Sequence, residues 1–326
     1  MLDIPVAFLI FNRPGVTRRV FAEIARARPK RLLIVADGPR SADEVEKCAD
    51  ARSVIDQVDW DCEVLTNFSD VNLGCKRRVS SGLDWVFEQC DSAIVLEDDC
   101  LPNHTFFPYC AELLEKYRND ERVMMVSGNN FQFGRERGPY SYYFSCYAHI
   151  WGWASWRRAW RHYDVGMSRW PALRGASWLQ SLFDDTAAVC YWEETLDRSY
   201  SGHIDSWDIQ WVFTCLAHNG LTVSPNVNLV SNIGFGAEAT HTKDDIYGVA
   251  ELQAGEIEAP LKHPPFVIRD KDADRFVFER IFAKEKERPG LYRRVGRRIL
   301  AALPSPFRNS VAYLRSRLRK SMERHN

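Results

Sequence analysis

Residues 92–99 read SAIVLEDD, an apolar run that ends in three consecutive acids. A continuous apolar run of this length is typical of a strand that is covered on both faces of a mostly parallel sheet. Ligands of such sheets bind beyond the carboxyl ends of the strands, which is where Glu97, Asp98 and Asp99 come. The segment therefore predicts an α/β fold with a polar site at the end of this strand.

The residues around this segment alternate between strand-like and helix-like patterns. We expect strands at 5–11, 31–36, 62–66, 92–96 and 123–127, and helices at 16–28, 42–58, 75–89 and 106–117. This alternation predicts a Rossmann-like, mostly parallel sheet flanked by helices. The regular pattern stops near residue 140, where an aromatic-rich stretch begins. Helices are expected again at 177–198 and from about 206 to 219, a strand at 221–224, and a loop at 243–265.

The charge of the chain is balanced overall but not along its length. Its 326 residues hold 43 Lys and Arg against 44 Asp and Glu, so nothing global indicates nucleic-acid binding. Residues 288–326, however, hold eleven Lys and Arg and one acid, with apolar residues at helical spacing. This pattern predicts a basic amphipathic helical tail that binds an anionic membrane surface, in preference to a protein partner or nucleic acid.

No apolar run approaches the roughly 20 residues that a membrane-spanning helix needs. The first residues also lack the basic and apolar regions of a signal peptide. We therefore expect a cytoplasmic protein, held at the inner face of the membrane by its tail.

Three adjacent carboxylates repel one another unless a cation neutralises them. Oxygen ligands favour Mg²⁺ or Mn²⁺, both of which leave coordination positions open for water and a diphosphate. Glu97, Asp98 and Asp99 therefore predict a site for a divalent cation. The alternative is an acidic turn that caps the helix beginning near residue 105.

Three further segments resemble a known family. Residues 8–14 (FLIFNRP), 35–38 (VADG) and 72–76 (NLGCK), in this order before the acidic triplet, are similar to the start of the N-acetylglucosaminyltransferase I family and its bacterial relatives. The match covers roughly residues 5 to 130. It implies a GT-A fold that uses a nucleotide sugar, with a donor half at 1–130, an acceptor half of the same domain at 131–287, and the tail at 288–326.

The resemblance also implies roles for single residues. Arg13 and Asp37 would hold the uridine and its phosphates, Asp98 would reach the ribose and sugar, and Asp99 would bind the metal, Mn²⁺ or Mg²⁺. The residues support this independently, because Asp37 can accept the imide N–H of uracil and Arg13 can pair with phosphate oxygens. Simpler alternatives are a turn at Asp37 and a helix start at Arg13. Lys76 lies at an expected helix N-terminus, where it can meet the diphosphate or remain solvated.

In the second half, residues 207–211 read WDIQW. By the resemblance Asp208 is the general base of an inverting transfer, with Asp205 as the reserve candidate. Trp153, in the segment WGW, would line the donor sugar, and Gly234 would lie in a loop that closes over the nucleotide sugar. His241, at the end of that loop, is a candidate ligand of metal or diphosphate. The alternatives are an N-cap acid, core tryptophans and a structural histidine.

These features predict a metal-dependent glycosyltransferase that moves a sugar from a UDP-sugar to a hydroxyl of a saccharide or lipid-linked glycan. Two alternatives stay open. A sugar-nucleotide nucleotidyltransferase shares the sheet and the metal, although residues 12–15 (NRPG) lack its basic Gly-rich loop. A catalytically inactive, membrane-tethered saccharide-binding scaffold would need neither the acids nor the metal.

The tail gives the first testable prediction. Deleting residues 288–326 removes the basic face, so the truncated chain is expected to lose binding to anionic vesicles while it still turns over a soluble acceptor. Co-sedimentation with anionic and neutral vesicles measures this loss. Unchanged binding to anionic vesicles would contradict the role of the tail.

Overall fold

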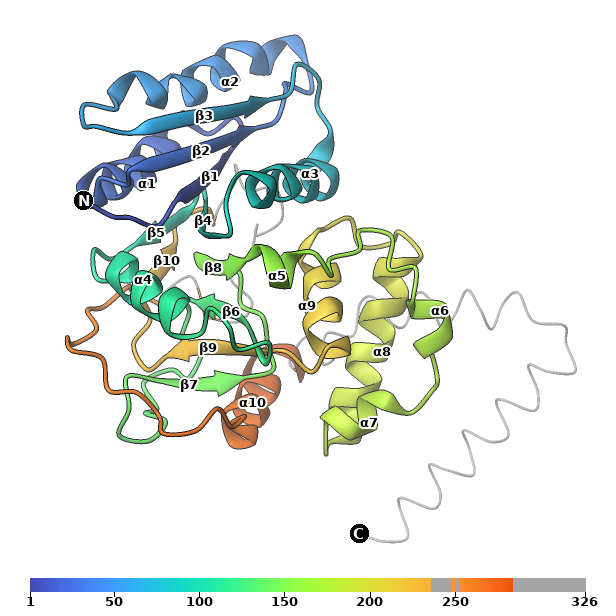
Figure 1. Cartoon of the computed structure of the whole chain (residues 1–326). Helices are drawn as coiled ribbons and strands as arrows, with labels where there is room; N and C mark the ends of the chain where they lie inside the picture. The colour runs from blue at the N-terminus through green and yellow to red at the C-terminus, as the bar shows by residue number, and fades with distance from the viewer. Residues whose placement is uncertain (236–247, 250–251, 284–326) are drawn as a thin grey trace, which may run out of the picture. The chain divides into compact units, whose positions relative to one another are not determined.

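The computed structural model describes residues 1–235, 248–249 and 252–283, and residues 1–280 form one compact unit (Figure 1). His241 and the basic tail at 288–326 lie outside the described residues. Their expected roles therefore stay predictions.

An eight-stranded sheet forms the centre of this unit. Its strands are β1 (Val6–Ile10), β2 (Arg31–Ala36), β3 (Glu63–Phe68), β4 (Ser92–Glu97), β6 (Val123–Ser127), β7 (Tyr142–Ser145), β8 (Trp153–Trp156) and β9 (Leu221–Pro225), in the order β3-β2-β1-β4-β8-β6-β9-β7. Neighbours β3, β2, β1 and β4 pair in parallel, as do β6 and β9, whereas β8 and β7 run antiparallel to their neighbours. The expected α/β fold with a mostly parallel sheet is confirmed.

Helices cover both faces of the parallel half. They are α1 (Pro14–Ala27), α2 (Val45–Arg52) between the short 3-10 helices at Ala42–Glu44 and Ser53–Gln57, α3 (Gly74–Gln89) and α4 (Phe106–Lys116). Alternate residues of a strand point to opposite faces. Val6, Phe8 and Ile10 share a core with α1 and α4, while α3 packs on the other face, where Gly82 lies against Val35.

In this sheet, the sequence did not predict the two antiparallel strands, β7 and β8. Both are short, fully buried and rich in aromatics, so they lack the alternation of apolar and polar residues that indicates a strand. The separate antiparallel pair of β5 (Cys100–Pro102) and β10 (Val230–Asn232) was not predicted either. The expected helix at 177–198 is two helices, α7 (Trp178–Leu182) and α8 (Thr186–Tyr200). They are separate because Asp185 caps α8, its side chain accepting a hydrogen bond from the Ala187 N–H at 2.8 Å.

The remaining helices lie beside and below the sheet in Figure 1. They are α5 (Arg157–Trp160), α6 (Trp170–Leu173), α9 (Asp208–Ala217) and α10 (Lys271–Val277), the last followed by a π-helical turn at Phe278–Phe282. Four aromatic residues, Trp153, Trp160, Trp207 and Trp211, form a buried group that we call the tryptophan cluster. It fixes the start of α9 against β8.

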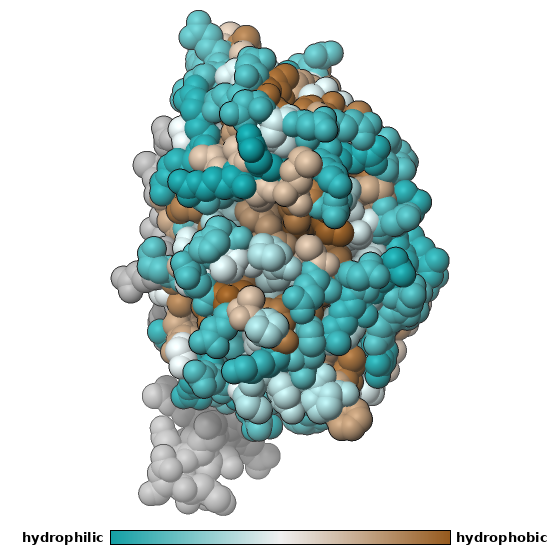
Figure 2. Space-filling view, turned by 60° about the vertical axis from the view of Figure 1, so that its left-hand side comes forward, coloured by the Kyte–Doolittle hydropathy of each residue, from teal (hydrophilic) through white to brown (hydrophobic). Residues whose placement is uncertain are grey.

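The face drawn in Figure 2 is mainly hydrophilic, with apolar side chains gathered near its middle. Among the described residues, the helices are too short or too polar to cross a bilayer.

The contact between α3 and β2 gives a test of the packing. Alanine in place of Gly82 would bring a methyl group into collision with Cγ1 of Val35, so overpacking of about 1–3 kcal/mol should outweigh the helix-propensity gain of about 1 kcal/mol. Gly82→Ala is expected to lower the free energy of unfolding in urea. Ser81→Ala, on the exposed neighbouring position, is the control and should be neutral or stabilising. A Gly82→Ala protein at least as stable as the wild type would contradict this packing.

Candidate functional site

The centre of the site is an ion pair between the end of β1 and the end of β4. Leu9 pairs with Glu97 in the parallel register, so Arg13, which precedes α1, lies beside Asp98 and Asp99. The Arg13 guanidinium donates to both carboxylates: Nε to Asp98 Oδ2 at 3.3 Å, Nη2 to Asp98 Oδ1, and Nη2 to Asp99 Oδ2 at 3.1 Å. The three side chains are at most 16% exposed. The structure thus brings together three of the residues expected to bind the donor.

Burial and mutual repulsion perturb this group. Burial raises the pKa of Asp98 to about 6, although Arg13 opposes the rise. Burial also raises the pKa of Glu97 well above its usual value, and the charges of Asp99, Asp98 and Asp208 add to this rise. For Arg13, burial alone would lower the pKa, but Asp98 and Asp99 outweigh it and raise the pKa. The site therefore holds more carboxyl groups than Arg13 alone can neutralise, and burial disfavours their charged form.

Asp208, at the first residue of α9, belongs to the same electrostatic group although it is distant in sequence. Its charge raises the pKa of Glu97 and also contributes to the raised pKa of the half-buried Cys75 thiol at the start of α3. Trp207 holds this helix end, because its ring stacks on Trp153 with centroids 5.8 Å apart and its carbonyl accepts a hydrogen bond from Tyr163 Oη at 3.0 Å. Asp208 is partly exposed and accepts no hydrogen bond from the described residues. Its carboxylate is available to a ligand.

Gly234 lies directly on the ion pair. The antiparallel pairing of β5 (Cys100–Pro102) with β10 (Val230–Asn232) brings its loop there, and the Ile233 N–H donates to the Asp99 carbonyl at 2.8 Å. A Cβ on Gly234 would overlap Asp99 Oδ2 and come within 2.8 Å of Arg13 Nη1. Only glycine allows the loop to approach this closely.

Asp37 has a structural task in this state. Its carboxylate accepts hydrogen bonds from the N–H groups of Gly38, Leu73 and Gly74 and from the Asn72 amide, all between 2.9 and 3.0 Å. These bonds fix the start of α3. If uracil donated a hydrogen bond to Asp37, it would do so to a carboxylate oxygen that already accepts these bonds. This contact stays a prediction.

The other expected residues differ in how they are placed. Lys76 is half-buried in the first turn of α3, next to Cys75, in agreement with its expected helix position. Trp153 is 0% exposed inside the tryptophan cluster, so in this state it packs the core and its faces are covered. The half-buried ring of Trp151 lies nearer the site, 5.8 Å from the ring of Phe235, which follows Gly234.

Sequence reasoning also missed two arginines at the carboxyl ends of β2 and β3, the buried Arg78 and the half-buried Arg52. Arg78 donates from Nε to the Ala36 carbonyl at 3.1 Å and from Nη2 to Asn67 Oδ1 at 2.7 Å, and burial lowers its pKa. Arg52 Nη2 donates to the carbonyls of Asp37 and Ser69 at 2.9 and 2.7 Å. Arg78 shares its helix face with Gly82 and Val86, and a basic residue in such a buried stripe was the available signal.

The expected divalent cation would need ligands from a bound substrate as well as from the protein. Within the described residues, no three His, Cys, Asp or Glu side chains are arranged to enclose a metal. Mg²⁺ and ions like it are commonly bound through one or two carboxylates and substrate phosphates. Asp99 and Glu97 are the carboxylates that would hold such a cation, which stays a prediction.

The chain matches no known family and no curated protein by sequence. Among solved structures it resembles apo UDP-glucose pyrophosphorylase (8% identity, TM-score 0.34, 70% of this chain and 93% of that one). It also resembles mouse xyloside xylosyltransferase 1 (12%, 0.33, 80% and 100%) and 4-diphosphocytidyl-2C-methyl-D-erythritol synthase from Anaerococcus prevotii (9%, 0.30, 66% and 98%). TM-scores this low leave the function to the residues of the chain itself.

The raised pKa values predict a pH-dependent stability. Carboxyls whose pKa is higher in the folded state stabilise the fold below their unfolded pKa, near 4, and this contribution is lost as pH rises through the folded pKa. Glu97→Gln removes one such group. With chelator present, its thermal stability relative to wild type should increase from pH 5 to pH 8.

Glu88→Gln, on the exposed surface of α3, is the control and should show no such trend. A Glu97→Gln protein whose stability stays parallel to that of the wild type across this pH range would contradict the buried, repulsive environment of Glu97.

Proposed function

We propose that the chain is a glycosyltransferase that moves a sugar from a UDP-sugar to a hydroxyl of a saccharide or lipid-linked glycan. The observation that supports this best is the juxtaposition of the acids after β4 with Asp208 at the start of α9. Asp98 and Asp99 pair with Arg13 at the carboxyl edge of the sheet. Asp208 is partly exposed and would face the second substrate.

On the donor side, Arg13 and Asp99 would meet the diphosphate. A divalent cation, Mn²⁺ or Mg²⁺, bound by Asp99 with Glu97 would neutralise charge on the departing nucleoside diphosphate. The Arg13 guanidinium is charged and largely shielded from solvent. Once the cation neutralises Asp98 and Asp99, the Arg13 N–H groups can pair with phosphate oxygens instead. The Gly234 loop, which lies against both residues, would exclude water from them.

On the acceptor side, Asp208 would be the general base. It takes the proton of the acceptor hydroxyl as that oxygen bonds to the anomeric carbon, while the bond from this carbon to the diphosphate oxygen breaks. A single displacement of this kind inverts the configuration at the anomeric carbon. Trp207 and the tryptophan cluster would keep Asp208 in place during the reaction.

The proposal is tested with two variants and a matched control. Purified protein is incubated with UDP-, GDP- and dTDP-sugars, with Mn²⁺ or chelator, and release of nucleoside diphosphate is measured. Asp99→Asn should abolish metal-dependent release. Asp208→Asn should still bind UDP but lower transfer to an acceptor by about 10²–10⁴-fold. Asp91→Asn, at the opposite end of β4 and exposed, should behave as wild type.

Two further measurements distinguish the rival functions. Pyrophosphate release from UTP and a sugar 1-phosphate, without turnover of any nucleotide sugar, would identify a nucleotidyltransferase. Saccharide binding that is unaffected by Asp99→Asn, with no nucleotide-sugar binding, would identify a scaffold. Either result overturns the proposal.

A further inference from the structure

Three arginines lie over two phenylalanine rings, one on α10 and one in the loop after β6. The Arg135 guanidinium carbon is 4.0 Å from the ring centroid of Phe276, Arg137 is 6.0 Å from the same ring, and Arg280 is 4.7 Å from the ring of Phe133. The two rings are 6.5 Å apart, edge to face. We call Arg135, Arg137 and Arg280 the arginine cluster.

The arginine cluster has no acidic partner in the part of the chain that the structure describes. No member forms an ion pair with a described acid, and the only side-chain bond among them is from Arg137 Nε to Gln132 Oε1 at 2.7 Å. The surrounding body is acidic, since residues 1–287 hold 32 Lys and Arg against 43 acids. Within the described residues, these three cations are therefore free to pair with an anionic group of a ligand.

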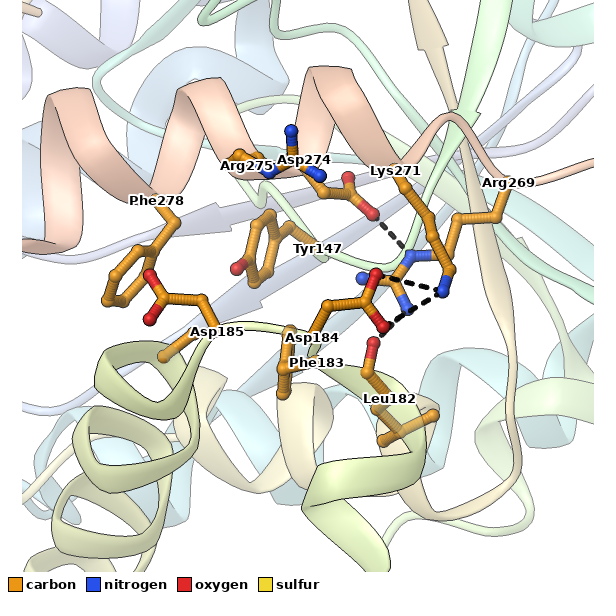
Figure 3. A pocket seen from close by; sticks show the side chains of 11 residues that line it. Tyr147, Leu182, Phe183, Asp184, Asp185, Arg269, Lys271, Asp274, Arg275 and Phe278 are labelled. Atoms are coloured by element: carbon orange, nitrogen blue, oxygen red, sulfur yellow. Dashed lines mark hydrogen bonds and ion pairs between the residues drawn. The ribbon is translucent and has the colours of Figure 1, made fainter.

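In a neighbouring pocket, lined by α10 and the segment before α8, the basic side chains do pair with acids (Figure 3). There Arg269 pairs with Asp274 at 2.6 Å and Lys271 pairs with Asp184 at 3.1 Å. These pairs anchor one side of α10. Phe276 lies two residues beyond Asp274, about 200° around the helix, so the anchored helix presents this ring away from the pocket.

The loop that bears two of the arginines is held in an unusual conformation. Phe133 has a φ of 50°, in the left-handed region that large side chains rarely adopt, and Gly134 follows with a φ of 85°. This turn places the Phe133 ring against the Phe276 ring and brings Arg135 over the Phe276 ring. Strain of this kind is common where a chain is shaped for a ligand.

The arginine cluster belongs to the same edge of the sheet as the proposed catalytic acids. Its loop follows the carboxyl end of β6, and the Arg137 N–H donates to Asn226 Oδ1 at 3.1 Å just beyond β9. β6 is parallel to β4, because both run antiparallel to β8.

A line of rings links the start of the loop to the Gly234 loop. Phe131 is 5.6 Å from Trp151, and Trp151 is 5.8 Å from Phe235. These contacts place the start of the loop that bears Arg135 and Arg137 beside the Gly234 loop.

We propose that the arginine cluster binds a phosphate or diphosphate group of the acceptor. A ring under a guanidinium covers one of its faces and leaves the N–H edges free. The N–H edge of a guanidinium can donate to two phosphate oxygens at once. Three guanidinium groups together suit a ligand with several anionic oxygens better than a single carboxylate. The inference rests on the proposed glycosyltransferase function and names the chemical class of its acceptor.

The first test maps protected arginines on the full-length chain. Phenylglyoxal modification is followed residue by residue by mass spectrometry, with UDP and Mn²⁺ present throughout. Inorganic pyrophosphate is expected to slow the modification of Arg135, Arg137 and Arg280 several-fold, and to leave Arg26, an exposed arginine on α1, unprotected. Equal modification with and without pyrophosphate at all three positions would overturn the proposal.

The second test compares variants by calorimetric titration with pyrophosphate and with decyl diphosphate. Arg135→Gln and Arg280→Gln should each weaken binding about tenfold, whereas Arg26→Gln should not. Tighter binding of decyl diphosphate through the same arginines assigns a lipid-linked acceptor, and equal binding assigns a soluble phosphorylated one. Unweakened binding in both variants refutes the site.

These outcomes are separate from those of the proposed function. A further arm, which compares modification of Arg13 with and without UDP and Mn²⁺, reports on the donor site alone. If UDP fails to protect Arg13 while pyrophosphate protects the arginine cluster, the glycosyltransferase proposal fails and the anion site remains.

Discussion

The site depends on the cost of burying carboxylates at the end of β4. The strand is covered on both faces, so the acids that follow it leave water together, and the pKa values of Glu97 and Asp98 rise. Arg13 is the counter-charge that makes this arrangement possible. Its place follows from the parallel register of β1 and β4, because the chain leaves both strands at the same edge.

The packing of the second half of the chain holds Asp208 near the acids that follow β4. Asp208 reaches Glu97 electrostatically because the tryptophan cluster fixes the start of α9 against β8, which is itself paired with β4. The short β5–β10 pairing brings Gly234 onto Asp99 in the same way. Segments from three regions of the chain thus meet at one sheet edge, and each is placed by apolar packing or by backbone hydrogen bonds.

The sequence was sufficient where the pattern was local. The run at 92–99 predicted β4, its burial and its acids, and the first-half strands of the eight-stranded sheet were found within a few residues. It was insufficient where partners decide the structure. The aromatic strands β7 and β8 have no alternating pattern. Nothing local shows that Asp37 caps α3, that Trp153 is enclosed by other tryptophans, or that Arg78 is buried, because each depends on residues distant in sequence.

A buried ion pair contributes little net stability, since desolvation offsets most of the attraction and apolar residues of similar volume often serve a fold as well or better. The contact of Arg13 with Asp98 and Asp99 is therefore poorly explained by stability alone. It is better explained by the exchange of partners that the proposed function requires. A cation bound by the acids, together with a phosphate bound by Arg13, would satisfy charges that the ion pair alone satisfies only in part. By the same reasoning, the cations of the arginine cluster, which have no acidic partner among the described residues, are explained by an anion that arrives with the second substrate.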